Sequence, residues 1–103
     1  MEPTFKAALD TFVSQAQAIV DAHMASFVNL PREVLTVEPG RRYVRVVRSN
    51  GGSSRSVYCF IDSTNGNVLK AESWKKPHPM MRGNVYRDPA NKCVDWHGAF
   101  YAR

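Results

Sequence analysis

The longest regular run of apolar positions lies within residues 3–29. Apolar side chains recur there at steps of three and four residues, which is the spacing of one face of an α-helix. Pro3 suits a first helical turn, where its missing amide costs nothing, and Pro31 marks the end of the pattern. The stripe consists of Phe5, Ala8, Leu9, Phe12, Val13, Ala16, Ile19, Val20, His23, Met24, Phe27 and Val28. The pattern predicts an amphipathic helix over residues 3–29.

This predicted helix is long compared with the strands of a small sheet. At ~1.5 Å per residue it would extend on the order of 40 Å, which is about twice the length of a strand of five or six residues. A small sheet would therefore leave part of the apolar stripe uncovered. Two interpretations stay open: the helix bends or frays, or the surplus face forms a homodimer through the N-terminal helix.

From residue 33 the spacing of apolar positions changes to the alternation that is typical of strands. Four stretches show it, and they are Glu33 to Val37, Arg42 to Arg48, Ser56 to Asp62 and Val68 to Ser73. Turn sequences separate them at residues 38–41, where Pro39 and Gly40 indicate a type II turn, at residues 50–52 and at residues 64–67. The sequence predicts an α+β fold in which residues 33–73 form an antiparallel meander of three to four strands, with the long helix packed on one face.

The periodicity is lost in residues 74–103. The stretch from Trp74 to Pro79 contains two prolines, each of which removes a backbone donor, so it does not suit a central strand or a helix interior. Arg82-Gly83-Asn84 is interpreted as a turn, and the segment from Val94 to Tyr101 is rich in aromatic residues. We expect a single domain over residues 1–103 whose irregular, aromatic-rich C-terminal segment docks on the rest of the protein.

Charge adds the first indication of function. Fourteen Lys and Arg residues against nine Asp and Glu residues give a formal net charge of +5. A basic surplus favours polyanions such as nucleic acid, although charges of this size also serve solubility alone. Alternation along the second predicted strand separates Val44 and Val46 from Tyr43 and Arg45. We expect the two valines to meet the helix and the other pair to lie on an open face, together with Tyr58 or its neighbours.

An open sheet face with aromatic rings and cations is how several protein modules hold single-stranded nucleic acid, because the rings stack on bases and the cations contact phosphates. Trp74 has two equally good interpretations, a base-stacking residue beside two lysines or a cap on the core at the end of its strand. The sequence predicts a nucleic-acid-binding protein, with single-stranded DNA favoured and weak sequence preference, because no helix resembles a groove-reading element. The predicted binding residues are Tyr43, Arg45, Lys70, Trp74, Lys75, Lys76 and Arg82.

Signals for other chemistry are weak. Cys93 and His97, together with His78, make the best set of metal ligands, but no paired Cys or His spacing supports them. No glycine-rich loop precedes a helix, and no nucleophile motif is present. We therefore predict no enzymatic activity, no catalytic residue, no metal and no cofactor.

The cysteines and the N-terminus bear on the compartment. Cys59 lies in an apolar run, Cys93 lies in a polar loop, and two cysteines make no disulfide framework. The N-terminus does not resemble a secretory signal, and no window approaches the ~18 apolar residues of a membrane-spanning helix. We expect a cytoplasmic protein that does not enter a membrane.

Four stretches form a recognisable pattern: Phe60-Ile61-Asp62, residues 65–70, Ser73-Trp74-Lys75 with Pro77, and residues 82–85. This pattern, Asn-Gly-Asn-Val-x-Lys, Ser-Trp-Lys-x-Pro and Arg-Gly-Asn, resembles small uncharacterised proteins of tailed bacteriophages. The resemblance implies a phage origin and action in the host cytoplasm, and it transfers no catalytic residue. The alternatives to nucleic-acid binding are a protein-interaction module that binds and modulates a host or phage enzyme, and a structural homodimer.

Overall fold

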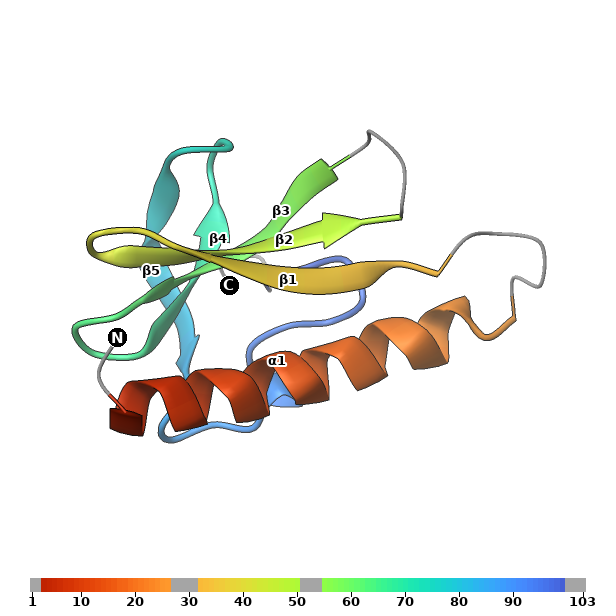
Figure 1. The fold of residues 1–103 in the computed structure, drawn as a ribbon, viewed down its shortest axis with the longest axis horizontal. Helices are drawn as coiled ribbons and strands as arrows, with labels where there is room; N and C mark the ends of the chain where they lie inside the picture. Colours follow the sequence, from red (N-terminus) through yellow and green to blue (C-terminus); the bar gives the residue numbers. More distant parts are fainter. Residues whose placement is uncertain (1–2, 27–31, 51–54, 100–103) are drawn as a thin grey trace.

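The residues that the structure describes form one α-helix, one short 3-10 helix and one five-stranded sheet (Figure 1). The computed structural model describes residues 3–26, 32–50 and 55–99. The elements in chain order are α1 (Pro3–Met24), β1 (Val34–Pro39), β2 (Tyr43–Ser49), β3 (Arg55–Asp62), β4 (Asn67–Ala71), β5 (Pro77–Asn84) and the 3-10 helix η1 (Ala90–Lys92). All neighbouring strands are antiparallel, in the order β1-β2-β3-β4-β5. Figure 1 shows α1 along one side of the sheet and the β4–β5 loop rising from the other side.

The α+β class and the antiparallel sheet are confirmed, but the predicted strand count is wrong. The sheet has five strands instead of three or four, and the additional strand, β5, lies in the segment 74–103 that was predicted to be irregular. Pro77 and Pro79 are tolerated because β5 is an edge strand, where a missing amide leaves no neighbour unpaired. The position of β5 in the sheet, and not its composition, permits these prolines.

Helix α1 is shorter than predicted. It ends at Met24, and residues 27–29 of the predicted helix lie outside the described residues. The apolar stripe of α1 packs against the core of the same chain. In addition to the fully buried residues, Val13, Ile19 and Met24 pack there. The fully buried members are Phe5, Leu9, Phe12, Ala16 and Val20. The homodimer through this helix stays a prediction, since Phe27 and Val28, which would supply the surplus apolar face, are not described.

The core lies between α1 and the helix-facing side of the sheet. Val44 and Val46 face α1, as predicted, with exposed fractions of 1% and 0%. The C-terminal segment completes this core through Ala90, Cys93, Val94 and Ala99. The side chain of Cys93 is buried in this core, although the loop that carries it is polar.

The docked C-terminal segment is held to α1 and β2 by polar and aromatic contacts. The His23 ring of α1 stacks on Trp96, with ring centroids 3.9 Å apart and planes 3° from parallel. Arg48 of β2 donates a hydrogen bond to the carbonyl oxygen of Trp96. Arg48 Nε also lies 2.9 Å from Glu33 Oε2, as an ion pair without the geometry of a directed hydrogen bond. His23 therefore has a packing role in the described structure.

A β-bulge in β3 moves Tyr58 out of regular pairing. Val46 pairs with Cys59, but Val47 pairs with Val57, so Tyr58 has no partner on β2. The side chain of Tyr58 is 3% exposed and belongs to the helix-side core. The sequence predicted that Tyr58 or its neighbours would lie beside Tyr43 on the open face. In the structure this residue is Phe60.

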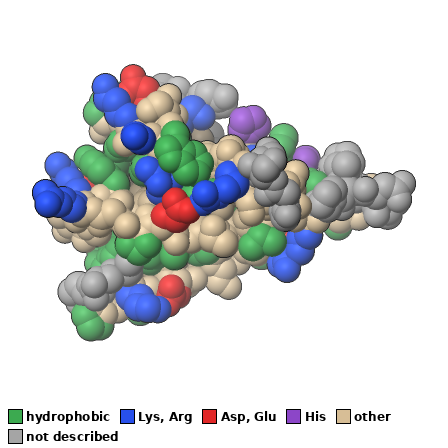
Figure 2. All heavy atoms as spheres, turned by 45° about the horizontal axis from the view of Figure 1, so that its top comes forward, with side chains coloured by type: hydrophobic (Ala, Val, Ile, Leu, Met, Phe, Trp, Pro, Cys, Tyr) green, Lys and Arg blue, Asp and Glu red, His purple; other side chains and the backbone are tan. Residues whose placement is uncertain are grey.

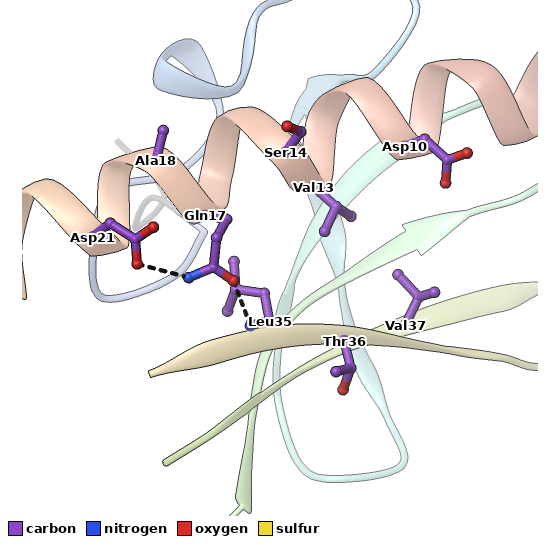
Figure 3. A pocket seen from close by; sticks show the side chains of 9 residues that line it. All are labelled: Asp10, Val13, Ser14, Gln17, Ala18, Asp21, Leu35, Thr36 and Val37. Atoms are coloured by element: carbon purple, nitrogen blue, oxygen red, sulfur yellow. Dashed lines mark hydrogen bonds between the residues drawn. The ribbon is translucent and has the colours of Figure 1, made fainter. Parts of the chain in front are cut away.

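The outer edge of β1 is covered by a side chain of α1. The Gln17 side chain accepts from the Leu35 amide at 2.8 Å (Figure 3). It also donates to the Glu33 carbonyl at 2.8 Å, so it bonds to β1 in the manner of a neighbouring strand. The unpaired backbone groups of an open strand edge can pair with strands of other chains. The two hydrogen bonds with Gln17 occupy such groups and protect this edge. Pro39 also leaves this strand without one amide donor.

The residues of the phage-like pattern join the β3–β4 turn to the end of β5. Asn84 Nδ2 donates to the Asn65 carbonyl oxygen at 2.8 Å and to Asn67 Oδ1 at 3.0 Å. The Val85 amide donates to the Gly66 carbonyl at 2.9 Å. These contacts define the Asn65–Asn84 joint, which connects two chain segments far apart in sequence.

Two glycines permit this joint. Gly66 has a φ of +82°, and a Cβ there would meet the Tyr86 ring at 2.6 Å. A Cβ at Gly83 would lie 2.3 Å from Cys93 Sγ. The interpretation of residues 82–84 as a turn is wrong, because they end strand β5, and the close approach at Gly83 is to Cys93 of the same chain.

Gly83→Ala is expected to lower the free energy of unfolding by about 1–3 kcal/mol, because the added methyl group overlaps Cys93 Sγ. Urea denaturation measures this change. The double variant Gly83→Ala, Cys93→Ala removes the overlapping sulfur atom, so Gly83→Ala should cost much less in the Cys93→Ala background. Equal costs in both backgrounds would contradict the explanation.

Candidate nucleic-acid interface

The sheet face opposite α1 carries two hollows on either side of Tyr43. The first, called the basic hollow, has a volume of about 500 Å³ and is lined by Glu38, Pro39, Gly40, Arg41, Arg42, Tyr43, Arg45, Phe60 and Lys75. The second, called the polar hollow, has a volume of about 590 Å³ and is lined by Arg42, Tyr43, Asp62, Asn65, Asn67, Leu69, Glu72, Lys76, Pro77, His78 and Pro79. Figure 2 looks towards this side and shows Lys and Arg side chains gathered around hydrophobic groups.

Tyr43 separates the two hollows. Its ring packs edge-on against Phe60, with centroids 6.4 Å apart and an interplanar angle of 76°. The Arg42 guanidinium lies 5.2 Å from the centre of the Tyr43 ring. Phe60 is 2% exposed, whereas Tyr43 is half-buried, so Tyr43 offers the accessible aromatic surface between the hollows.

The β1–β2 turn positions the two arginines that precede Tyr43. A type II turn at residues 38–41 would require a positive φ at Gly40, which Gly40 does not have. Strand β1 continues through Pro39 instead, and the Gly40 amide donates to the Tyr43 carbonyl at 3.1 Å. The turn therefore lies further along the chain than predicted, and Arg41 and Arg42 stand at its tip.

A buried carboxylate holds Arg42. Asp62 is 2% exposed, and its Oδ2 accepts from Arg42 Nε at 3.1 Å, while the amide and hydroxyl of Thr64 donate to its Oδ1 at 2.9 Å and 2.6 Å. Burial opposes the ionisation of Asp62, but the hydrogen bonds from Thr64 and the Arg42 ion pair outweigh it and lower its pKa below the ordinary value. Asp62 is thus an anchor for Arg42, whose own side chain remains 60% exposed.

Trp74 lies against two arginines on this face and not in the helix-side core. Arg45 Nε donates to the Trp74 carbonyl at 2.8 Å, and the guanidinium carbon of Arg45 lies 4.7 Å from the Trp74 ring centroid. The guanidinium carbon of Arg55 lies 5.3 Å from the same ring. These contacts are cation–π interactions. Trp74 is 37% exposed, so part of its ring remains accessible.

Glu38 bridges the same two arginines. Its Oε1 accepts from Arg45 Nη1 at 3.0 Å, and its Oε2 accepts from Arg55 Nη2. The hydrogen bond from Arg55, supported by Arg45, lowers the pKa of Glu38 below its ordinary value. The carboxylate is therefore ionised at neutral pH. Together Glu38, Arg45, Arg55 and Trp74 form a cluster, called the Trp74 clamp below.

The structure brings most of the predicted binding residues together. Tyr43, Arg45, Lys75 and Lys76 line the hollows, and Trp74 adjoins them through Arg45. Among the described residues, Arg41 and Lys75 have no ion-pair partner, whereas Lys76 Nζ lies 3.6 Å from a Glu72 carboxylate oxygen.

Two of the predicted residues lie elsewhere. Leu69 pairs with Phe60 and Val68 with Ile61, so alternation along β4 places Lys70 on the side of Val68, away from the hollows. Arg82 lies on the edge strand β5, where its Nη1 donates to the Met80 carbonyl at 2.6 Å, and it lines neither hollow.

Sequence reasoning missed several residues of the interface, namely Glu38, Arg41, Arg42, Asn65, Asn67 and His78. Arg41 and Arg42 had a detectable signal, because they follow a predicted turn next to Tyr43. Glu38 had a weaker one, since a short hairpin brings it opposite Arg45. Asn65 and Asn67 come with the β3–β4 turn, whereas His78 joins the face only through the pairing of β4 with β5.

A third hollow, between α1 and β1, does not suit a polyanion (Figure 3). Its volume is about 750 Å³, and its lining includes Asp10 and Asp21 but no Lys or Arg. Val13, Leu35 and Val37 supply its apolar part. Carboxylates would repel phosphates at this position, so the basic sheet face is the better candidate.

Within the described residues, no group of three His, Cys, Asp or Glu side chains could hold a metal ion, and Cys93, His97 and His78 form no such group. Burial raises the pKa of the Cys93 thiol to about 11, which is typical of an inert structural cysteine. No described helix is both long enough and apolar enough to span a membrane.

Asp62→Asn is expected to lower the free energy of unfolding at pH 7, because the amide loses the charge that pairs with Arg42. The folded-state pKa of Asp62 lies below its unfolded value of about 3.9. Its stabilisation is therefore complete above that pH and is lost as the pH falls through the folded-state pKa. Urea denaturation of both proteins should show a difference at pH 7 that shrinks as the pH falls through the folded-state pKa of Asp62.

The control for this variant is Asp10→Asn, which removes a solvent-exposed ion pair with Lys6 and should change stability little. A difference between wild type and Asp62→Asn that stays constant from pH 7 to acid would contradict the assigned role.

Comparisons with known proteins give a family but no described activity. No curated protein and no solved structure matches the chain. A family model, described as a family of unknown function (DUF7717), matches residues 6–102. The matched range includes most of α1, the whole sheet and the docked C-terminal segment. The chain therefore belongs to the family of unknown function DUF7717.

Proposed function

We propose that this protein binds single-stranded nucleic acid, with single-stranded DNA favoured, across the two hollows on the sheet face opposite α1. The observation that carries the proposal is the position of Tyr43 between two hollows whose walls hold Arg41, Arg42, Lys75 and Lys76. Aromatic surface flanked by cations on both sides matches the alternation of bases and phosphates along a single strand.

The chemistry of the interface divides between stacking and charge. Tyr43 and the exposed part of Trp74 supply rings for bases, and each stacked base contributes about 1–3 kcal/mol in proteins of this kind. Arg41 and Lys75, without ion-pair partners among the described residues, are the cations most available to phosphates. The formal net charge of +5 attracts the strand over a longer range.

Sequence preference is expected to be weak. Helix α1 is packed along the other side of the sheet (Figure 1), so it is not available to enter a major groove beside this face. Contacts to phosphates and to the flat faces of bases tolerate every sequence. The resemblance to phage proteins agrees with such a role in a host cytoplasm, where single-stranded intermediates arise.

Lys75→Glu, Lys76→Glu is expected to weaken binding to a fluorescent oligothymidylate at least tenfold at low salt, because it reverses two charges beside the hollows. Each lost phosphate contact should also reduce the slope of log affinity against log salt by about 0.7. Fluorescence anisotropy at two salt concentrations, with duplex DNA and RNA for comparison, measures both quantities.

The matched control is Lys6→Glu, Lys92→Glu, which changes the net charge equally on exposed positions of α1 and η1. If this control weakens binding as much as Lys75→Glu, Lys76→Glu does, the hollows are not the interface. Wild-type binding that ignores added salt would exclude a phosphate-contacting mode altogether.

Tyr43→Ala is expected to weaken binding of the same oligonucleotide about fivefold to a hundredfold, which corresponds to one lost stacking contact. Tyr43→Phe keeps the ring and should bind within about twofold of wild type. Equal losses in the two variants would assign the role to the hydroxyl group and contradict stacking. Urea denaturation of each variant shows whether the fold is retained.

A second candidate is a protein-interaction surface on β5 that binds a host or phage enzyme. Met80 and Met81 are 52% and 40% exposed on this edge strand, and exposed methionines next to an open edge favour protein contacts. A complex that survives nuclease treatment and is lost in Met80→Glu would support this candidate. A homodimer would instead appear as concentration-dependent sedimentation.

A further inference from the structure

We propose that Glu38 occupies a phosphate subsite of the interface, and that a phosphodiester of the bound strand displaces it from Arg45 and Arg55. The inference rests on the proposed function and deepens it, because it names the atoms that receive one phosphate. It also makes Glu38 an internal competitor that lowers the affinity of the free protein.

The hydrogen-bonding pattern of Glu38 is that of a bound anion. Each of its two carboxylate oxygens accepts from a different arginine, Oε1 from Arg45 and Oε2 from Arg55. Two guanidinium groups converging on two oxygens of one anion is an arrangement that arginines also form with phosphate. A phosphodiester has two non-bridging oxygens. Each of them can take the place of one carboxylate oxygen of Glu38.

The surroundings of Glu38 favour a ligand phosphate over a carboxylate of the chain. Glu38 lines the basic hollow together with Arg41 and Lys75, neither of which has an ion-pair partner among the described residues. One carboxylate thus lies amid more positive charge than it neutralises. Figure 2 shows an acidic group flanked by basic side chains on this side of the molecule.

The aromatic ring of the clamp adds a base site beside the phosphate site. Both arginines that hold Glu38 also face the Trp74 ring, at 4.7 Å for Arg45 and 5.3 Å for Arg55. A nucleotide whose phosphate replaces the Glu38 carboxylate would therefore have its base within reach of the exposed part of Trp74. The subsite accordingly suits a nucleotide unit of a strand better than an isolated anion.

Displacement of Glu38 is energetically inexpensive. The side chains of Glu38 and Arg55 are 37% and 45% exposed. Ion pairs that are this accessible to water contribute little to stability, and their side chains can rotate into solvent. An incoming phosphate restores the contacts of both arginines, so the net cost to the protein is the reorientation of one carboxylate.

The test measures oligothymidylate binding by Glu38→Gln with fluorescence anisotropy. Removing the competing charge is expected to tighten binding about threefold to tenfold at low salt. The slope of log affinity against log salt should steepen by up to about 0.7, as expected for one additional phosphate contact. In a Trp96→Phe background, quenching of Trp74 fluorescence should saturate at a lower oligonucleotide concentration with Glu38→Gln than without it.

Asp10→Asn is the matched control, because it raises the net charge equally on the exposed surface of α1. Glu38→Ala should tighten binding in the same direction as Glu38→Gln, and urea denaturation should show both variants folded. If Asp10→Asn tightens binding as much as the Glu38 variants do, the change in net charge alone explains the gain. That result would overturn the proposed subsite. Unchanged or weaker binding by both folded Glu38 variants would also overturn it.

These outcomes separate the two proposals. If the wild-type protein binds the oligonucleotide and the Glu38 variants bind no more tightly, the subsite is excluded. The proposed function is not affected by that result. Failure of wild type and of both Glu38 variants to bind any single strand at low salt defeats the proposed function, and the subsite with it.

Discussion

The candidate binding face of this protein exists because one amphipathic helix covers only one side of the sheet. Phe5, Leu9 and Phe12 of α1 are at most 2% exposed, and burial of each such side chain contributes on the order of 1.5–3 kcal/mol. This burial determines which side of every strand turns inward. Since side chains alternate along a strand, the inward position of Val44 commits Tyr43 to the opposite face.

The opposite face is organised by charge more than by apolar packing. Asp62 anchors Arg42, and Glu38 holds the two arginines that contact Trp74. The Glu38 pairs are partly open to water, so each of them stabilises the fold only modestly. Asp62 is buried and keeps Arg42 in place. In the proposed function, this surface holds its arginines in place for a polyanion.

The pattern that resembles phage proteins contributes both to a structural joint and to the candidate binding surface. Asn84 connects β5 to the β3–β4 turn, Gly66 supplies a left-handed backbone and Gly83 leaves room for Cys93. Other residues of this pattern line or adjoin the proposed interface, namely Phe60, Asp62, Asn65, Asn67, Leu69, Trp74, Lys75 and Pro77. The resemblance by itself therefore assigns no activity, which has to be argued from the face.

The sequence by itself determined an N-terminal helix, the first four strands and the inward position of Val44, because hydrophobic periodicity is a local property of the chain. It placed the β1–β2 turn too early and the helix end too late. It did not predict strand β5, whose prolines are acceptable only at a sheet edge that pairing with β4 creates. Nor did it predict the bulge that buries Tyr58 or the clamp that brings Trp74 to Arg45 and Glu38. These features depend on contacts between residues distant in sequence, so only the tertiary structure decided them.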